Sequence, residues 1–382
     1  MKTFNGHILH IPRWYPGLNG PQGGIFISKH IASSQNYRHS VINVNTSKGK
    51  EIPLKRVLFT SSENINTYSY FYRSGNRLLS SFNYCIGIYR CIRQILKENN
   101  KPDLIHAHVL LRTYVVAYVL HILFKRPYII TEHWSGYHYG LYHQKAKTYR
   151  FLLKRTLKGA EKVLVVSDRL RNDILACIPL DKTKLKILPN VAENTSETKP
   201  QKQGSTIKIV TVADLKDNIK RVSGVIEAMK RLTNKNDIEY HIIGDGPDLN
   251  NLKQLADQLL NEKIYFYGEL SNEDVLKKLP EFDFLIQNSQ YETFGLVPVE
   301  ALLSGLPVIS TTTGCPEEVQ LREAGIFIEP DQPEELMKAI DKMIHTFREY
   351  DLIPVQKIIN QKFSVEAVGE MQEQIYNEIL NR

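Results

Sequence analysis

The sequence predicts an α/β protein built from two doubly wound parallel-sheet domains. Short apolar segments typical of buried strands alternate with segments of helical periodicity along most of the chain. The alternation stops in the polar run 191–206 and begins again after it, which indicates a linker between two similar domains. The length of 382 residues is sufficient for two hydrophobic cores of ordinary size.

The elements expected before the linker follow a strand–helix order. Strands are expected at 7–11, 41–45, 104–108, 128–131, 162–167 and 185–190, and helices from 25, at 78–97 and, as a buried helix, at 115–124. After the linker we expect strands at 207–213, 238–243, 264–267, 284–286 and 306–309, and helices at 221–232, 248–260 and 297–304. An amphipathic helix is expected at 364–380.

Composition is that of a soluble globular protein, with 42% hydrophobic and 24% charged residues. The four cysteines have no C-x-x-C spacing, so free thiols in a reducing compartment are expected. We find no H-E-x-x-H motif, and we interpret His106 and His108 as strand and cleft residues rather than metal ligands. With no apolar signal-peptide core and no spanning segment, a cytoplasmic location is expected.

Charge is distributed unevenly along the chain. Residues 1–190 contain 29 Lys and Arg against 9 Asp and Glu, a net charge of +20, whereas residues 191–382 contain 20 against 32, a net charge of −12. A basic half of this kind suits nucleic acid, an anionic membrane or a diphosphate-bearing substrate. For the helix at 78–97, with Arg90, Arg93 and Lys97, we favour packing on the core with a solvated basic face over membrane contact.

Two carboxylates, Glu292 and Glu300, flank one expected strand-to-helix turn. The backbone N–H groups of Gly295, Leu296 and Val297 begin the helix, where the helix dipole and the unpaired N–H groups favour a phosphate. Glu300 can reach past such a phosphate to a ribose diol, as acidic residues do in dinucleotide sites. The alternative is that Glu300 only complements the helix dipole and Glu292 lies in water.

Two further sites lie in the first half. Gly23 and Gly24 stand at a helix start, where they fit close approach to a phosphate or a sugar, although a glycine pair is also typical of an ordinary turn. His133 follows the strand at 128–131, and side chains at the carboxyl ends of parallel strands line the ligand crevice. A hydrogen-bonded structural histidine is the alternative for His133.

The string S-x-Y-E-T-F-G-x-x-x-x-E-A-x-x-x-G-x-P-V, at 289–308, resembles the E-x7-E signature of the retaining glycosyltransferases of family 4, of the bacterial polysaccharide-biosynthesis type. The run P-R-W-Y-P…N-G-P-Q-G-G-I-F also resembles the first loop of one branch of this family. The resemblance implies a GT-B fold of two facing Rossmann-like domains. It assigns acceptor binding to 1–193 and nucleotide-sugar binding to 194–363, with a helix at 364–382 returning to the first domain.

The resemblance also implies roles for individual residues. T-E-H-W, at 131–134, matches the place where the family has a histidine on the donor sugar, so Glu292 and His133 are the expected catalytic residues. The expected donor-binding residues are Gly23, Gly24, Lys220, Arg221, Thr293, Phe294, Gly295, Leu296, Val297 and Glu300. The turn at 244–246 is similar to a recurrent structural turn of the family.

One position departs from the family pattern. Family members usually have an arginine after the first strand of the second domain and a lysine about six residues later, both on the donor diphosphate. Here Asp214 replaces the arginine, while Lys220 is kept. Asp214 is expected to turn away or to pair with Lys216, Lys220 or Arg221, and Arg221 is the candidate for the missing positive charge.

The expected function is that of a retaining hexosyl or related transferase, moving a sugar from a nucleoside-diphosphate sugar to a hydroxyl acceptor. The expected acceptor is a lipid-linked glycan in cell-envelope or capsular polysaccharide synthesis, met at the inner face of the cytoplasmic membrane. With no Asp-x-Asp pair in the sequence, neither metal nor other cofactor is expected. The alternatives are a sugar-nucleotide 2-epimerase of the same fold, or a nucleic-acid-binding protein using the basic half, although no such motif is visible.

Overall fold

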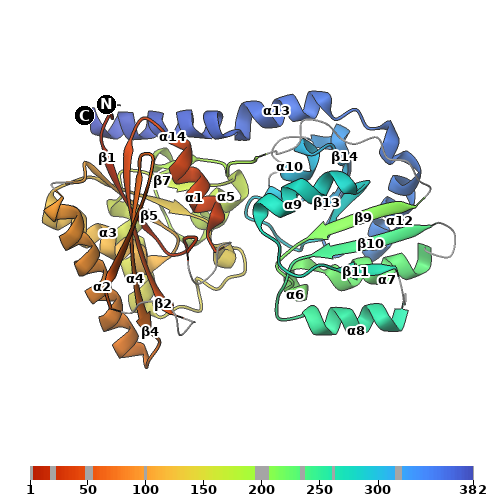
Figure 1. The fold of residues 1–382 in the computed structure, drawn as a ribbon, viewed down its shortest axis with the longest axis horizontal. Helices are drawn as coiled ribbons and strands as arrows, with labels where there is room; N and C mark the ends of the chain where they lie inside the picture. Colours follow the sequence, from red (N-terminus) through yellow and green to blue (C-terminus); the bar gives the residue numbers. More distant parts are fainter. Residues whose placement is uncertain are drawn as a thin grey trace. The chain divides into compact units, whose positions relative to one another are not determined.

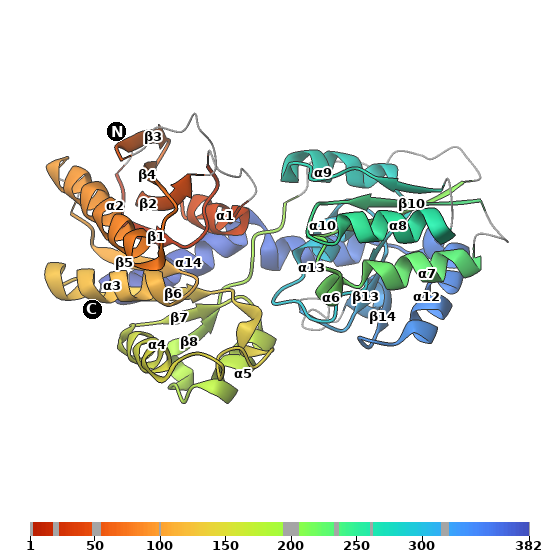
Figure 2. The ribbon, with the colours of Figure 1, turned by 90° about the horizontal axis from the view of Figure 1, so that it is seen from below.

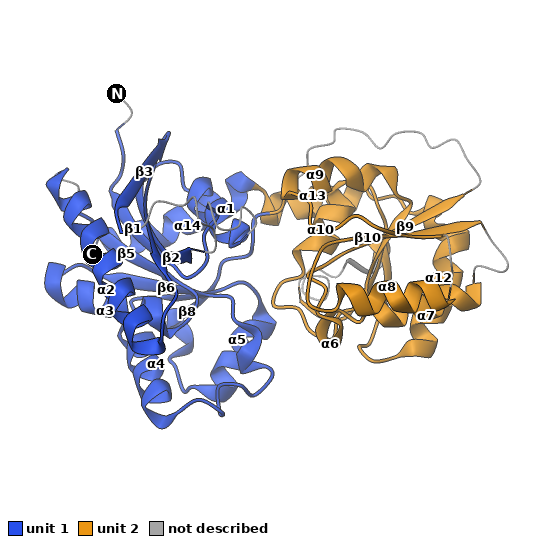
Figure 3. Cartoon of the chain, turned by 60° about the horizontal axis from the view of Figure 1, so that its bottom comes forward, with its two compact units in different colours: residues 1–191, 365–382 blue, residues 192–364 orange. Residues whose placement is uncertain are grey.

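The computed structural model describes residues 3–17, 23–47, 55–98, 101–193, 206–232, 237–259, 263–314 and 321–381. The chain divides into two compact units (Figure 3). Unit 1 comprises residues 1–191 and 365–382, and unit 2 comprises residues 192–364. Most of the run expected to be a linker, 194–205, lies outside the described residues.

The described part of unit 1 is built on a sheet of eight strands in the order β3-β4-β2-β1-β5-β6-β7-β8. All neighbours are parallel except β3 and β4, an antiparallel hairpin that we did not expect from the sequence. The strands are β1 His7–Pro12, β2 Arg38–Ser47, β3 Val57–Ser62, β4 Ile65–Arg73, β5 Leu104–His108, β6 Tyr128–Glu132, β7 Val163–Val165 and β8 Leu185–Ile187.

Helices cover both faces of this sheet (Figures 1 and 2). Helices α2, α3 and α4 lie on one face, and α1 packs against α14 on the other. The helices are α1 Ile25–Ser33, α2 Arg77–Lys97, α3 Leu111–Phe124, α4 Lys147–Gly159, α5 Asp168–Cys177 and α14 Val365–Leu380. The last helix belongs to unit 1 because Val368, Ile375 and Tyr376 are buried with Ile8 and Leu104 in one hydrophobic cluster.

Unit 2 contains, among its described residues, a parallel sheet of six strands in the order β11-β10-β9-β12-β13-β14. The strands are β9 Ile207–Val212, β10 Ile238–Ile243, β11 Ile264–Phe266, β12 Phe284–Gln287, β13 Val308–Thr311 and β14 Gly325–Ile328. The helices are α6 Asp217–Lys220, α7 Val222–Leu232, α8 Leu249–Leu259, α9 Asn272–Lys278, α10 Leu296–Leu303, α12 Pro333–Thr346 and α13 Ile353–Phe363. The predicted fold class, two doubly wound parallel sheets, is confirmed.

The expectation that α2 packs on the core is confirmed for its later turns, where Ile88 and Ile95 are buried. Its first turns differ, because Leu79 and Phe82 are 51% and 64% exposed. The expectation that α3 is a buried helix was wrong, since Ile122 and Leu123 are 57% and 67% exposed. No helix in the described part of the chain combines the length and hydropathy needed to cross a bilayer.

Imidazole rings fill part of the unit 1 interior, on the face of the sheet that α1 and α14 cover. His10 in β1 is paired in register with His106 in β5, and His106 also bonds to the Tyr376 hydroxyl of α14 at 2.9 Å. His108 stacks on His106, with ring centroids 4.0 Å apart. His10, His106 and His108 are near enough to hold a metal ion, but each already has hydrogen-bond partners.

The hydrogen bonds show which ring nitrogen donates and which accepts in three of these histidines. The Ser34 carbonyl can only accept, so His39 Nε2 donates to it (2.6 Å) and His39 Nδ1 accepts from His10 Nε2 (2.9 Å). His10 Nδ1 then accepts from His108 Nε2 at 3.0 Å. This chain of neutral rings leaves His108 Nδ1 as a buried acceptor with no partner among the described residues.

We predict that unit 1 loses stability on mild acidification. Burial lowers the pKa of His30 and His39 from 6.5 to about 4, and lowers the pKa of His10, His106, His108 and His133 well below 6.5. Below pH 6.5 the unfolded chain therefore binds protons at these histidines that the folded unit does not bind. The stability contribution is complete above this pH and falls by about 1.4 kcal/mol per pH unit for each neutral histidine, down to its folded pKa.

Tryptophan fluorescence measures this effect for unit 1 alone, because both tryptophans of the chain, Trp14 and Trp134, belong to that unit. Urea unfolding curves recorded between about pH 7.5 and about pH 5 should show a falling free energy of unfolding. A free energy that stays constant over this interval would contradict the buried, neutral state of the histidines.

Candidate active site

The strand order of unit 2 reverses between β9 and β12. From β9 the sheet continues through β10 to β11, and from β12 it continues in the opposite direction through β13 to β14. The loops after β9 and β12 therefore diverge at the carboxyl edge of the sheet, the place where open α/β sheets bind their ligands. Lys220 follows β9 and Glu292 follows β12, so both stand at this switch point.

Glu292 and Lys220 form a half-buried ion pair across the switch point. Lys220 Nζ lies 2.5 Å from Glu292 Oε1, and the two side chains are 23% and 15% exposed. Ser289 Oγ donates to the same carboxylate oxygen at 2.7 Å. The backbone joins the two loops as well, because the N–H of Gln290 donates to the carbonyl of Ile219 at 2.7 Å. Glu292 is thus a fixed carboxylate with a cation beside it.

Helix α10 begins immediately after this carboxylate. Gly295 is its N-cap in the left-handed conformation (φ 77°, ψ 58°), which costs glycine little. Gly295, Leu296 and Val297 line a small cavity of about 40 Å³ together with Lys220 and Glu292. The first N–H groups of a helix have no partner within it, so this cavity suits an anion at the positive end of α10.

Gln287, the last residue of β12, was missed as a site residue from the sequence. Its side chain lines the same cavity, and its Nε2 is buried with no hydrogen-bond partner among the described residues. A buried amide without a partner is unusual and suits a ligand atom. The available signal was a polar residue closing the apolar strand F-L-I-Q, at the carboxyl edge where side chains line the crevice.

Glu300 lies one turn into α10 and is only 2% exposed. Asn272, the first residue of α9, donates its amide N–H to Glu300 Oε1 at 3.3 Å. The end of α10 is held by Gln356 of α13, which donates to the Leu302 and Leu303 carbonyls at 3.0 and 3.1 Å. Glu300 therefore projects from a helix whose position is fixed at its far end.

Other predicted donor residues differ in what their side chains can do. The Phe294 ring is buried edge-on against Phe363, with centroids 5.4 Å apart, so only the backbone of Phe294 is placed to meet a ligand. Thr293 is half-buried between Glu292 and Phe294. The turn at Gly244 and Gly246 is structural, because a Cβ at either position would collide with the backbone of residues 213 or 215.

The structure does not bring Arg221 to the cavity. Its φ of 53° ends α6 in the left-handed conformation, and its guanidinium pairs with Asp331. Arg221 therefore lines a separate pocket, not the one beside Glu292. Asp214 pairs with Lys216 at 2.6 Å, one of the arrangements expected, which leaves Lys220 as the cation at the cavity.

The remaining predicted residues belong to unit 1. His133 follows β6, and its ring lies 4.5 Å from that of Phe26 and 5.8 Å from that of His30, centroid to centroid. Burial lowers its pKa well below 6.5, so the ring is neutral at neutral pH. Its Nε2 is buried with no partner among the described residues.

Glu132 holds the backbone that carries His133, a role that the sequence did not indicate. Its fully buried carboxylate accepts from the N–H groups of His133 (2.9 Å) and Trp134 (3.0 Å). The hydroxyls of Tyr114 and Tyr137 donate to its second oxygen at 2.7 and 3.1 Å. Burial raises the pKa of Glu132, and these four donors oppose that effect.

Gly24 has a structural reason to be glycine. It is the N-cap of α1 with φ 78°, and a Cβ would lie 2.5 Å from the Trp14 carbonyl. The close approach that the sequence suggested is thus made by the backbone of Trp14. Gly23 is exposed and borders a different pocket of unit 1.

Two family models match the chain. The model described as glycosyl transferases group 1 matches residues 193–351, and that described as glycosyltransferase family 4 matches residues 28–193. Together these matches cover most of both units.

Curated relatives are also similar over long segments. An uncharacterized glycosyltransferase of Methanocaldococcus jannaschii is 26% identical over 296 residues, which is 72% of this chain and 75% of the relative. The GPI3 subunit of phosphatidylinositol N-acetylglucosaminyltransferase of Saccharomyces cerevisiae is 24% identical over 281 residues, 70% of this chain and 61% of that subunit.

Solved structures share the fold at lower identity. Sucrose-phosphate synthase of Thermosynechococcus elongatus has a TM-score of 0.78 at 17% identity, covering 99% of this chain and 100% of that one. HepE of Anabaena, in complex with UDP and glucose, has a TM-score of 0.73 at 17% identity, covering 98% and 100%.

Proposed function

The chain belongs to the glycosyltransferases of family 4 and has the GT-B fold, and from this we propose that it transfers a sugar from a nucleoside-diphosphate sugar to an acceptor hydroxyl with retention of anomeric configuration. The predicted family and the predicted transferase class are confirmed by the family matches. The single observation that carries the proposal is the Glu292–Lys220 pair beside the start of α10.

The donor diphosphate would bind at the start of α10. The N–H groups of Gly295, Leu296 and Val297 and the Lys220 ammonium supply hydrogen-bond donors and positive charge on one cavity. A phosphate bound there would share the Lys220 ammonium with Glu292, and the positive end of α10 would meet the remaining negative charge. These groups are in position before reaction, which is the arrangement that stabilises charge developing on a leaving group.

Glu292 would face the donor sugar and Glu300 the ribose. Glu292 is held by Ser289 and Lys220, so its carboxylate is oriented rather than freely rotating. Glu300 projects from α10, the helix whose start would bind the phosphates, and is held there by Asn272 of α9. Acidic residues bind ribose hydroxyls in this way in dinucleotide sites.

His133 would contact the donor sugar as a hydrogen-bonding group rather than as a charge. Its ring is neutral because burial lowers its pKa, and Nε2 has no partner among the described residues. Glu132 fixes the turn from which the ring projects. A neutral imidazole can donate to or accept from a sugar hydroxyl without adding charge to the site.

We place the acceptor on unit 1 and the enzyme on the surface of an anionic membrane. Three neighbouring helices of unit 1 expose apolar side chains among basic ones. The exposed apolar residues are Leu78, Leu79, Phe82 and Tyr89 of α2, Val119, Ile122 and Leu123 of α3, and Phe151 and Leu152 of α4. Exposed basic residues on the same helices include Arg93 and Lys97 of α2 and Lys147 and Arg155 of α4.

This combination suits peripheral attachment, in which apolar side chains enter the interface and basic ones bind anionic headgroups. Arg90 contributes less freely, because it donates to the Lys55 carbonyl and lies over the Tyr70 ring. Attachment of this kind would bring a lipid-linked glycan acceptor to the enzyme, as in envelope or capsular polysaccharide synthesis. A basic surface that only confers solubility is the competing explanation.

Replacing Glu292 with glutamine tests the site directly. We expect Glu292→Gln to lose about 2–4 kcal/mol of transition-state stabilisation, so that kcat falls roughly 30-fold to 1000-fold with the fold intact. Turnover is measured with UDP-, GDP- and ADP-sugars, first as slow donor hydrolysis; UDP-sugars come first because HepE was solved with UDP. Glu281→Gln, which removes a carboxylate from a surface ion pair with Lys278, is the matched control.

Glu300→Ala should weaken nucleotide binding more than it slows the chemical step, because its proposed partner is the ribose. A loss of about 1–3 kcal/mol is expected for a hydrogen bond to a charged group. Calorimetric titration with free nucleoside diphosphate measures it, and a melting curve shows whether the buried site still folds. Binding as tight as that of the wild type would leave Glu300 a helix-dipole residue only.

Transfer should need no divalent metal and should keep the anomeric configuration of the donor. The charge on the leaving group is met by Lys220 and α10, and retention follows from the family resemblance. Activity should survive excess EDTA, and proton NMR of the first product formed should show the donor's anomer. Complete loss of activity in EDTA, or an inverted product, would refute the corresponding part of the proposal.

Membrane attachment is measured by liposome sedimentation. Each basic residue near an anionic bilayer contributes up to about 1 kcal/mol, so the protein should sediment with anionic but not neutral vesicles. Binding should disappear at about 0.5 M salt, where the Debye length is only a few ångströms. Phe82→Ser and Arg93→Gln should weaken vesicle binding, whereas the control Arg348→Gln in unit 2 should not. A protein that sediments with neither anionic nor neutral vesicles would contradict membrane attachment and favour a soluble acceptor.

A further inference from the structure

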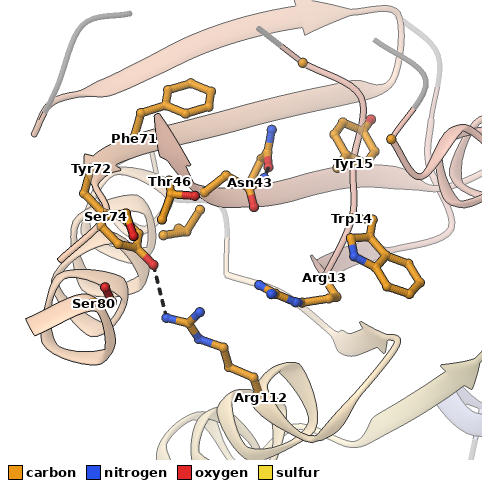
Figure 4. Close-up of a pocket in the computed structure, with 14 residues that line it drawn as sticks. Arg13, Trp14, Tyr15, Asn43, Thr46, Phe71, Tyr72, Ser74, Ser80 and Arg112 are labelled. Carbon is orange, nitrogen blue, oxygen red and sulfur yellow. Dashed lines mark hydrogen bonds between the residues drawn. The ribbon is translucent and has the colours of Figure 1, made fainter. Parts of the chain in front are cut away.

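Unit 1 contains a pocket of about 480 Å³. Of the residues predicted to bind the donor, only Gly23 lines this pocket. It lies at the carboxyl ends of β1, β2 and β4 and at the start of α3 (Figure 4). Arg13 and Arg112 reach into it from two different elements, with their guanidinium groups facing the same space. The pocket is also lined by Trp14, Tyr15, Asn43, Asn45, Tyr72 and Ser80.

The charge of this pocket is unbalanced. No carboxylate is among the described residues that line it, and neither arginine has an ion pair among the described residues. Two guanidinium groups that converge without an acidic partner repel each other, and a bound anion removes that repulsion. Arginine is also the residue that binds phosphate and carboxylate oxygens in a fixed forked geometry.

The Arg112 side chain is held in place, and Arg13 is anchored through its backbone. The Arg112 guanidinium lies 3.3 Å from the centre of the Tyr84 ring and donates to the Tyr72 hydroxyl at 3.4 Å. The backbone N–H of Arg13 donates to the His108 carbonyl at 3.0 Å. The restraint on the Arg112 guanidinium lowers the entropy that this side chain loses when it binds a ligand.

Backbone strain between the two supports a functional reading. Val109 and Leu110 have φ of 58° and 67°, conformations that a β-branched or bulky residue rarely adopts. The turn they form connects His108, which anchors Arg13, to the start of α3, which carries Arg112. Thr113 Oγ1 lies 3.0 Å from the Val109 carbonyl and 2.9 Å from that of Leu110, which holds the turn. Strain of this kind concentrates at binding sites.

We propose that this pocket binds the phosphate of a phosphorylated saccharide acceptor. The proposal rests on the proposed function, since it names the acceptor class for the transferase. A phosphate monoester carries nearly two negative charges at neutral pH, which matches two guanidinium groups, whereas a single carboxylate leaves one unmatched. Asn43, Asn45 and Ser80 offer hydrogen bonds to sugar hydroxyls, and the Trp14 and Tyr15 rings border the same space.

The phosphate could belong to a soluble sugar phosphate or to a polyprenyl diphosphate sugar. Both carry about two negative charges on phosphate oxygens, the sugar phosphate on one phosphorus and the diphosphate diester on two, so the proposal names this shared chemistry and the experiment identifies the source. Soluble binding is measured by titrating glucose 1-phosphate, with methyl glucoside as the phosphate-free control. Membrane binding is measured with neutral phosphatidylcholine vesicles with and without polyprenyl diphosphate.

Three variants test the pocket, all titrated in the presence of saturating nucleoside diphosphate to occupy the donor site. Arg13→Gln and Arg112→Gln should each weaken binding of the phosphate probe about tenfold or more. Asn43→Asp should do the same without changing side-chain size, because the new carboxylate keeps the acceptor for Asn45 Nδ2 and repels the phosphate. Arg348→Gln, an exposed arginine of unit 2, should bind the probe as wild type does.

The outcomes separate this proposal from the proposed function. Loss of probe binding in the three variants, with nucleoside diphosphate binding unchanged, supports the pocket as the acceptor phosphate site. Probe binding at the wild-type affinity in Asn43→Asp and in both arginine variants overturns it. Binding of malate, a dicarboxylate without phosphate, as tightly as glucose 1-phosphate also overturns it. A protein that binds the phosphate probe through these residues but no nucleoside diphosphate would refute the transferase function and leave the pocket standing.

Discussion

The ion pair between Lys220 and Glu292 is the interaction on which the candidate active site depends. It joins the loops that leave the two strands at the switch point of the unit 2 sheet, and it neutralises a carboxylate beside the positive end of α10. A carboxylate alone in that position would repel a phosphate. With Lys220 between them, an anionic ligand and an anionic side chain can occupy one small cavity.

Sequence reasoning reached this part of unit 2 because its signals are local. The alternation of apolar strands and helices predicted both sheets, and the E-x7-E string located the turn that carries Glu292 and Glu300. The direction in which a side chain points, however, depends on partners that are distant in the sequence. Arg221 adjoins Lys220 in the chain, but a left-handed backbone at Arg221 points its side chain to Asp331, and the Phe294 ring turns inward to meet Phe363.

Unit 1 was less predictable because its interior depends on distant partners. His106 bonds to Tyr376, 270 positions later in the chain, and His10 meets His39 and His108 from neighbouring strands. Periodicity cannot show which polar residues find such partners, so a sheet face of buried imidazoles looks like a set of cleft residues. Leu79 and Phe82 were assigned to the core because helical periodicity shows an apolar face of a helix. Periodicity does not show whether another element covers that face, and here both side chains are exposed.

The return of the last helix has a consequence for biosynthesis. Residues 1–191 do not contain the whole core of unit 1, because Ile375, Tyr376 and Ile379 of α14 complete it. On the ribosome, the segment forming unit 2 emerges in full before α14 does, so unit 2 can reach its native state first. The earliest part of the chain must wait for the latest, with the hydrophobic surface that α14 will cover exposed meanwhile. Chaperones that bind nascent chains would find their longest-lived target there.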